Sequence, residues 1–147
     1  MDSLEKFLSL IAYAEGTYHI GDRGYNCIIG STKKKPILFT DYREHPRKGV
    51  FVRRLGIYST AAGRYQILLR YYRAYKRRLS LKDFSPASQD AIAVQMIKEQ
   101  GALDDIHKGK IQEAILKCHK IWASFPGSPH KQSKITMKEL LDFYERL

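Results

Sequence analysis

Apolar residues recur with helical spacing at the beginning of the chain, which predicts a first helix with one buried face. Asp2 and Glu5 have the spacing of a capping box and can begin this helix. Gly16 can end it, so that Glu15 is its last residue. The apolar stripe consists of Leu4, Phe7, Leu8, Ile11 and Ala12.

The helical period is absent between Thr17 and about Gly63, where short β-type runs alternate with Gly, Lys and Pro. Residues 25–30 and 37–40 are the clearest runs, and they predict a small irregular sheet or hairpin. The lysines and the proline at 33–36 predict an exposed loop between the two runs.

Helical patterns return after Gly63, where a helix with one apolar and one basic face is predicted. Ser85 and Pro86 can begin the next helix, and Gly101 can end it. The apolar face of the first of these helices holds Tyr65, Leu68, Leu69, Tyr72, Tyr75 and Leu79, and its basic face holds Arg70, Arg73, Lys76, Arg77 and Arg78.

The rest of the chain is predicted to be helical as well. A short turn is expected at 104–109, and an apolar stripe over 111–122 marks another helix. Residues 125–129 carry two prolines and a glycine and break the helical pattern. Thr136 with Glu139 is a second capping box, which begins the last helix.

This order of elements predicts an α+β fold of one domain. A helix is followed by a strand-containing region and then by a run of helices, and the 147 residues suffice for one hydrophobic core. We therefore expect a single domain over residues 1–147, with a mostly helical lobe and a small β lobe. A ligand cleft is expected between the two lobes.

The chain is strongly basic. It has 26 Lys and Arg against 15 Asp and Glu, a formal net charge of +11. Such a charge indicates a polyanionic partner, which could be nucleic acid, an anionic membrane surface or an anionic cell-wall polymer. The basic residues at 70–78, mixed with tyrosines, keep a nucleic-acid-binding module as one alternative, although no recognised nucleic-acid motif accompanies them.

The cysteines and the N-terminal sequence argue against a metalloprotein, a secreted protein and a membrane-spanning protein. Cys27 and Cys118 lie far apart without metal-ligand spacing, so we expect two buried free thiols, no metal and no organic cofactor. Residues 1–6 are acidic where an export signal is basic, and no stretch is long enough to span a membrane. We therefore expect a protein made in the cytoplasm without an export signal of its own.

Glu15 is the first candidate for chemistry. A carboxylate at the end of an apolar helix faces the negative end of the helix dipole, and its Ala and Tyr neighbours predict partial burial. Both effects favour the protonated form and raise the pKa, as a general acid requires near neutral pH. The alternative interpretation is an ordinary solvated glutamate in a last helical turn.

The second candidate stretch is residues 59–66. Its small residues and Gly63 permit close approach of a ligand, and hydroxyl and amide groups suit the binding of sugars. Those groups belong to Ser59, Thr60, Tyr65 and Gln66. The alternative is a plain helix start, with Ser59 or Thr60 as its cap.

Several blocks follow one another along the chain. They are Ala14–Thr17, Gly24–Tyr25, Ile28–Gly30, Leu38–Tyr42, His45–Lys48, Gly63–Gln66, Leu81–Pro86, Ser88–Ala91 and Ile121–Gly127. Their order resembles the bacteriophage lambda endolysin family, the lambda-type lytic transglycosylases of the lysozyme superfamily. The resemblance runs from the first helix to about Pro129, and the sequence after that matches poorly.

The resemblance implies a lysozyme-like fold with Glu15 as the single catalytic acid. This residue would cleave the bond between N-acetylmuramic acid and N-acetylglucosamine in peptidoglycan and leave 1,6-anhydromuramic ends. The resemblance also implies that Ser59, Thr60, Tyr65 and Gln66 line the cleft. Asp41 and Tyr42 would approach the substrate from the facing lobe. The alternatives are local roles, with Asp41 in a turn and Tyr65 in the core.

Two further expectations accompany the resemblance. The enzyme would be a monomer that collects in the cytoplasm of a Gram-negative host until a separate holin gives it access to the wall in the periplasm. A hydrolytic lysozyme remains the alternative activity, and it would need a second carboxylate, for which Asp22 and Asp41 are the candidates.

Overall fold

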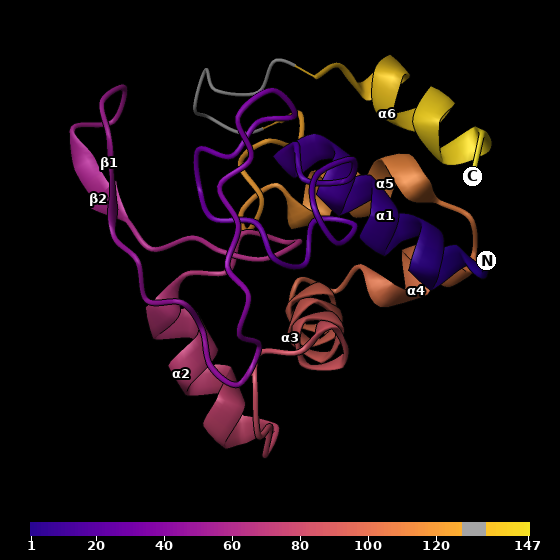
Figure 1. Cartoon of the computed structure of the whole chain (residues 1–147). Helices are drawn as coiled ribbons and strands as arrows, with labels where there is room; N and C mark the ends of the chain where they lie inside the picture. Colours follow the sequence, from indigo (N-terminus) through magenta and orange to yellow (C-terminus); the bar gives the residue numbers. More distant parts are fainter. Residues whose placement is uncertain (128–134) are drawn as a thin grey trace. The chain divides into compact units, whose positions relative to one another are not determined.

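A computed structural model describes residues 1–127 and 135–147 (Figure 1). Ser128 and Pro129, the end of the predicted breaker at 125–129, lie outside the described residues. The described elements are α1 (Ser3–Glu15), β1 (Val50–Val52), β2 (Ile57–Ser59), α2 (Leu69–Arg78), α3 (Pro86–Glu99), α4 (Leu103–His107), α5 (Ile111–Cys118) and α6 (Met137–Glu145).

The chain forms two compact units, which are described in turn. The helical unit comprises Met1–Glu15 and Ala93–Leu147, and the loop-rich unit comprises Gly16–Ile92. The helix α3 contributes its second half to the first unit and its first half to the other. The described residues thus form a mostly helical fold with one small antiparallel sheet, as the sequence predicts.

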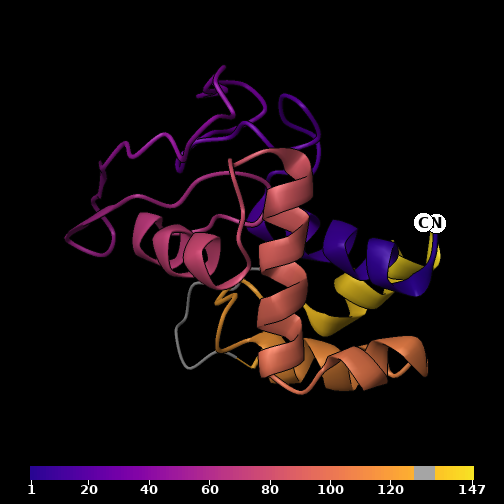
Figure 2. The ribbon, with the colours of Figure 1, turned by 90° about the horizontal axis from the view of Figure 1, so that it is seen from below.

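In the helical unit, α1 packs against α4 and α6, and α5 packs against α4 and α6. Both ends of the chain lie close together (Figures 1 and 2), and Lys6 Nζ is 5.2 Å from the centre of the Tyr144 ring. Stacking of the Tyr13 and Phe143 rings, with centroids 4.0 Å apart, joins α1 to α6. The fully buried apolar side chains of this unit include Phe7, Leu10, Ile11, Ile97, Ile106, Ile115, Phe125 and Leu140.

Both ends predicted for α1 and the start predicted for α6 are confirmed, whereas α5 ends at Cys118 and does not extend to Trp122 as predicted. Asp2 N donates to Glu5 Oε2, and Glu5 N donates to Asp2 Oδ1, which is the reciprocal capping box expected for α1. Gly16, with a φ of +81°, follows the last residue of α1. Thr136 Oγ1 accepts a hydrogen bond from the backbone N–H of Glu139 at the start of α6.

The turn expected at 104–109 is wrong, because Leu103–His107 forms the short helix α4. Two apolar residues explain the helix, since Ala102 and Ile106 are both fully buried one helical turn apart. A helix of five residues is too short to show a period in the sequence.

The sheet of the loop-rich unit lies outside the runs that the sequence favours. The strands β1 and β2 pair antiparallel, with Phe51 opposite Tyr58. Residues 25–30 and 37–40 form only isolated bridges, between Cys27 and Leu38 and between Ile28 and Ala62. Positive φ angles at Gly24 and Gly30 turn the chain at both ends of the first run, so a longer ladder cannot form.

The basic helix α2 begins at Leu69 and not directly after Gly63 as expected. Gly63 and Gln66 have φ angles of +81° and +53°, which a right-handed helix cannot include. Tyr72 and Tyr75 are buried as predicted, whereas Tyr65 is buried in the preceding loop. The predicted basic face is solvent-exposed at Arg70, Arg73, Arg77 and Arg78, and Lys76 is half-buried.

Two further predictions are confirmed. The α3 helix begins at Pro86, and Ser85 Oγ accepts a hydrogen bond from Ser88 N at 3.3 Å. Cys27 and Cys118 are both buried free thiols. None of the helices in the described part of the chain has the length and apolar character needed to cross a membrane.

Candidate active site

Glu15 is the last residue of α1, and its side chain keeps only part of its surface exposed. Ser124 Oγ donates a hydrogen bond to Glu15 Oε1 at 3.1 Å. Ser124 belongs to the turn that follows α5, between the buried rings of Trp122 and Phe125. The Phe125 ring packs 5.9 Å from Phe7 of α1, so the core of the helical unit fixes the serine beside the carboxyl group.

Burial raises the pKa of Glu15 from 4.5 to about 7, and the Ser124 hydrogen bond opposes this shift by favouring the charged form. The prediction of a buried carboxyl with a raised pKa is therefore confirmed. A solvated glutamate would have kept its ordinary pKa. Near neutral pH the carboxyl group is protonated in a large fraction of molecules, which is the state that a general acid needs.

The partnership with Ser124 is a feature that sequence reasoning missed. The two residues are 109 positions apart, so no local spacing connects them. The available signal was a small polar residue between Trp122 and Phe125 in an apolar segment. A polar side chain in such a place needs a hydrogen-bond partner, because an unpaired buried polar group is costly.

Ser59 is the last residue of β2 and Thr60 follows it, and both are half-buried. Thr60 Oγ1 accepts a hydrogen bond from the backbone N–H of Leu69, the first residue of α2. Ser59 Oγ accepts a weaker one from Ala61 N at 3.3 Å. The alternative interpretation of a helix start capped by Ser59 or Thr60 is wrong, because α2 begins at Leu69 with Leu68 as its N-cap, and Thr60 contacts the helix start from nine residues away.

Tyr65 and Gln66 lie in the loop before α2. The Tyr65 side chain is completely buried, and its hydroxyl donates to Asp90 Oδ1 at 2.5 Å, which is the core role considered as its alternative. Gln66 is half-buried, and its Nε2 donates to the Gly63 carbonyl at 2.9 Å. That bond stabilises a loop in which Gln66 itself has a positive φ.

Asp41 and Tyr42 belong to the segment before the hairpin. Asp41 is exposed, and the Arg43 guanidinium donates hydrogen bonds of 2.8 and 3.1 Å to its carboxylate. These bonds lower the pKa of Asp41. The Tyr42 hydroxyl donates to Asp22 at 2.9 Å, and burial together with this bond raises the pKa of Tyr42. An open hollow of about 460 Å³ is lined by Asp41, Arg43, Glu44, His45 and Pro46.

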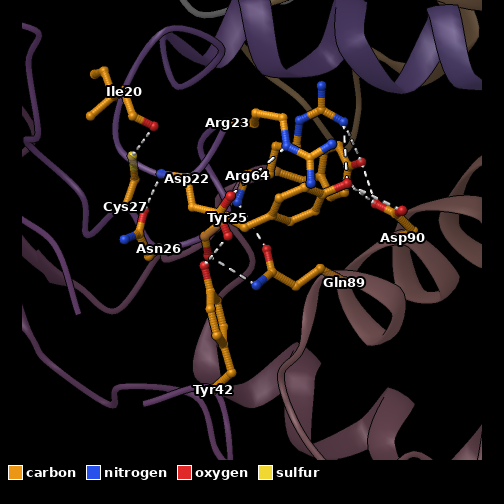
Figure 3. A network of polar contacts seen from close by, with 11 residues as sticks. Ile20, Asp22, Arg23, Tyr25, Asn26, Cys27, Tyr42, Arg64, Gln89 and Asp90 are labelled. Carbon is orange, nitrogen blue, oxygen red and sulfur yellow. Dashed lines mark hydrogen bonds and ion pairs between the residues drawn. The ribbon is translucent and has the colours of Figure 1, made fainter. Parts of the chain in front are cut away.

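A buried network of polar contacts around Arg64 includes Tyr25, Gln89 and Asp90 (Figure 3). Arg64 Nη1 lies 3.2 Å from the Tyr65 hydroxyl and 3.4 Å from the Tyr25 hydroxyl, and both tyrosines donate to Asp90. Burial, followed by the negative charge of Asp90, raises the pKa of both tyrosines. Both phenols therefore stay protonated donors between a cation and an anion.

Gln89 adds further hydrogen bonds to this network. Its fully buried amide donates to the carbonyl groups of Tyr25 and Phe84 and accepts from Arg64 N, with bonds of 2.9–3.0 Å. Thr17, two residues after Glu15, donates from Oγ1 to the Arg64 carbonyl at 2.6 Å. This bond fixes the beginning of the loop-rich unit to its loop of residues 63–66.

His45 is a core residue. Its Nδ1 accepts from Arg47 N at 3.0 Å, so Nε2 carries the proton and donates to the Ile67 carbonyl at 2.9 Å. Burial lowers the pKa of His45, which keeps the ring neutral. Within the described residues there is no group of three or more His, Cys, Asp or Glu side chains that could hold a metal ion.

Comparisons with known proteins show the family of the chain. Residues 5–147 match the model of the endolysin family. The endolysin of Escherichia phage P2 is 42% identical over 146 residues, covering 95% of this chain and 88% of the relative. The endolysin of Escherichia phage lambda is 48% identical over 130 residues, covering 86% of this chain and 78% of the relative.

Solved structures show the same relationship. A structure of bacteriophage lambda lysozyme in complex with a chitohexasaccharide superposes with a TM-score of 0.89 at 43% identity, covering 99% of this chain and 94% of that one. A second lambda lysozyme structure gives a TM-score of 0.87 at 42% identity with the same coverage. The chain therefore belongs to the endolysin family, the phage enzymes that lyse the host cell wall.

Proposed function

We propose that residues 1–147 act as a single catalytic domain that cleaves peptidoglycan by lytic transglycosylation, with Glu15 as its acid and base. The bond cleaved joins C1 of N-acetylmuramic acid to O4 of N-acetylglucosamine. The observation that carries the proposal is the buried carboxyl group of Glu15, whose pKa of about 7 allows it to give and to take a proton near neutral pH.

The proposed reaction needs only one carboxyl group. Glu15 donates its proton to the glycosidic oxygen as the bond from that oxygen to the muramic C1 breaks. The carboxylate then accepts the proton of the muramic C6 hydroxyl, whose oxygen bonds to C1. The nucleophile belongs to the substrate itself, so its effective concentration is high and no water is consumed.

The proposal needs no second carboxylate to explain the raised pKa of Glu15. Burial of the side chain is the main cause of the raised pKa, and the Ser124 hydrogen bond opposes it.

A hydrolytic lysozyme is the second candidate, and it would use Asp22 or Asp41 to activate water or to attack the sugar. Both carboxylates already have partners in the structure. Asp41 is held by Arg43, and Asp22 accepts from the Tyr42 hydroxyl with Arg23 Nε at 3.9 Å. Those contacts leave lone pairs free on both carboxylates, so the identity of the product ends decides between the two candidates.

The ligand of the lambda enzyme suggests how this chain binds its substrate. Because a lambda lysozyme structure contains a chitohexasaccharide, we propose that this chain also binds a β-1,4-linked strand of N-acetylated sugars. Ser59, Thr60 and Gln66 are only half-buried, so we propose that such a strand can reach them. For Tyr65 we propose an indirect role, because its side chain is buried against Asp90.

The route to the wall is also proposed by analogy with the family. The enzyme would act as a monomer, collect in the cytoplasm of a Gram-negative host and reach the periplasmic wall when a separate holin opens the membrane. Induced cells should therefore stay intact until chloroform permeabilises the inner membrane. Lysis on induction alone would contradict the dependence on a holin.

A turbidity assay on chloroform-treated Gram-negative cells tests the enzyme proposal. Glu15→Gln keeps the size of the side chain but cannot donate a proton, so we expect clearing to slow by at least about a hundredfold. Glu113→Gln on the exposed side of α5 makes the same change of charge and should leave the rate unaltered. Full activity of Glu15→Gln would contradict the proposal and favour a binding module, with nucleic acid as the first ligand to test.

A further inference from the structure

The helix α2 of the loop-rich unit carries a row of arginine residues on its solvent-exposed side. Arg70, Arg73 and Arg77 follow one another at spacings of three and four residues, so they lie along one face of the helix. All three are exposed, and so is the small Ala74 among them. These three residues, called the arginine row below, span about 10 Å along the helix axis.

The charges of the arginine row are not balanced by acids. Residues 64–82 contain no Asp or Glu, and within the described residues no carboxylate forms an ion pair with the row. Like charges three or four positions apart destabilise a helix, and Arg70 in the first turn also opposes the helix dipole. A bound anion would relieve this repulsion, which favours a binding surface over a plain solvated face.

The opposite face of α2 is already used inside the unit. Tyr72 and Tyr75 are buried, and the Tyr72 ring packs 5.1 Å from the ring of Phe84 and 5.8 Å from that of His45. The helix therefore has no apolar face left to insert into a membrane. Its arginine row offers guanidinium groups, which bind the paired oxygens of a carboxylate or a phosphate.

The start of α2 is joined to residues for which we propose contact with the glycan. Thr60 Oγ1 accepts a hydrogen bond from Leu69 N at 3.0 Å, and Arg70 is the next residue of the helix. Gln66 lies three positions before Leu69. A glycan strand that reaches Thr60 and Gln66 therefore passes close to the first turn of α2. In peptidoglycan such a strand carries short peptides on its muramic acids, and these peptide stems have free carboxylates.

We propose that the arginine row binds the free carboxylates of the peptide stems of peptidoglycan. The inference rests on the proposed function and adds to it, because the preferred substrate is then the peptide-bearing strand and not the bare glycan. Arg70 is closest along the chain to Thr60 and meets the stem first, and Arg73 and Arg77 continue the contact along the peptide. Nucleic acid or lipid phosphates would match the charge of the row, but nothing about them requires a position beside Thr60 and Gln66.

Kinetics on two matched substrates test the proposal. Uncrosslinked glycan strands with their peptide stems are compared with the same strands after an amidase has removed the stems. We expect kcat/KM of the parent to be at least about tenfold higher on the peptide-bearing strands, since three exposed ion pairs each contribute modestly. In Arg70→Gln/Arg73→Gln/Arg77→Gln this ratio should fall to about one, mainly through a higher KM on the peptide-bearing strands.

A lysine variant separates the arginine row from net charge. Lys33→Gln/Lys34→Gln/Lys35→Gln removes the same charge from an exposed loop of the same unit and should keep the ratio of the parent. The arginine variant should unfold at no lower temperature than the parent, because it removes repulsion within α2. A ratio near one in the parent, an unchanged ratio in the arginine variant or an equal fall in the lysine variant would overturn the proposal.

A titration of the parent protein depends neither on a variant nor on activity. The free stem peptide should shift the NMR signals of the Nε–H groups of the arginine row, whereas the same peptide with amidated carboxyl groups should not. Unmoved signals, or shifts caused by an oligonucleotide and not by the peptide, would overturn the proposal. Inactivity of the parent on both kinds of strand would contradict the proposed function instead, and the titration would still decide whether the peptide site exists.

Discussion

Replacing Ser124 by alanine should raise the pKa of Glu15 and move the pH dependence of the enzyme. Ser124 Oγ donates to Glu15 Oε1 at 3.1 Å, and this bond opposes the burial that raises the pKa to about 7. Alanine removes the donor and leaves the surrounding rings of Trp122 and Phe125 unchanged. The charged carboxylate then loses its stabilising partner, so its proton is held to higher pH.

The size of the shift follows from the energy of the bond. A hydrogen bond to a charged group contributes about 1.5–3 kcal/mol, and a protonated carboxyl group retains part of that interaction. A net preference of about 1.4 kcal/mol for the charged form corresponds to one pKa unit. We therefore expect the pKa of Glu15 in Ser124→Ala to rise to about 8.

Two measurements report this shift. Because the protonated acid is the active form, activity falls as the pH rises through the pKa of Glu15, and this alkaline limb of the kcat/KM profile should move up by about one pH unit. Carbon-13 NMR of the labelled glutamate carboxyl group should show the same shift in the absence of substrate. Ser124→Thr keeps the hydroxyl and should restore a pKa near 7.

An unchanged or lowered pKa in Ser124→Ala would refute this reasoning, because it would mean that the serine does not stabilise the charged carboxylate. A lower kcat with an unmoved pH profile would refute it as well. That result would assign to Ser124 a packing role that any small residue could fill.

Three further predictions concern stability. Glu15 stays neutral in the folded protein up to about pH 7 but ionises near pH 4.5 in the unfolded chain, so the stability of the parent falls as the pH rises between these values. In urea unfolding, Glu15→Gln should therefore be more stable than the parent by about 3 kcal/mol above pH 7 and equally stable below pH 4.5. Gln89→Ala should lower the free energy of unfolding by about 3–5 kcal/mol, because three buried backbone groups lose their hydrogen-bond partner. Gln95→Ala on the same helix is the control and should lower it by less than about 1 kcal/mol, because Gln95 is only half-buried. Gly63→Ala should cost about 2 kcal/mol or more in thermal unfolding, because φ is +81° there and a Cβ would overlap the Gln89 amide; a loss below about 0.5 kcal/mol would show that the loop around Gly63 adapts freely.

The helices whose ends depend on neighbouring residues could be predicted from the sequence. The capping pairs Asp2 with Glu5 and Thr136 with Glu139 act within one turn, and so does Pro86 at the start of α3. The hairpin could not be predicted, because Phe51 and Tyr58 are exposed and give no alternation of buried and polar positions.

The site could be predicted only where its chemistry is local. Glu15 could be found from the apolar helix before it and the glycine after it. Ser124 could not, since folding alone brings it to the carboxyl group from 109 residues away. For Tyr65 the sequence suggested a sugar-binding role that its position does not favour, because the side chain is completely buried beside Asp90.

The chemistry of the product ends tests the central claim most directly. Purified sacculi digested in water enriched in oxygen-18 would be analysed by mass spectrometry, with Glu15→Gln as the inactive control. The account predicts 1,6-anhydromuramic ends that are one water lighter than reducing ends and carry no label. Labelled reducing ends would contradict transglycosylation and would require a second carboxylate, with Asp22 and Asp41 as the residues to replace first.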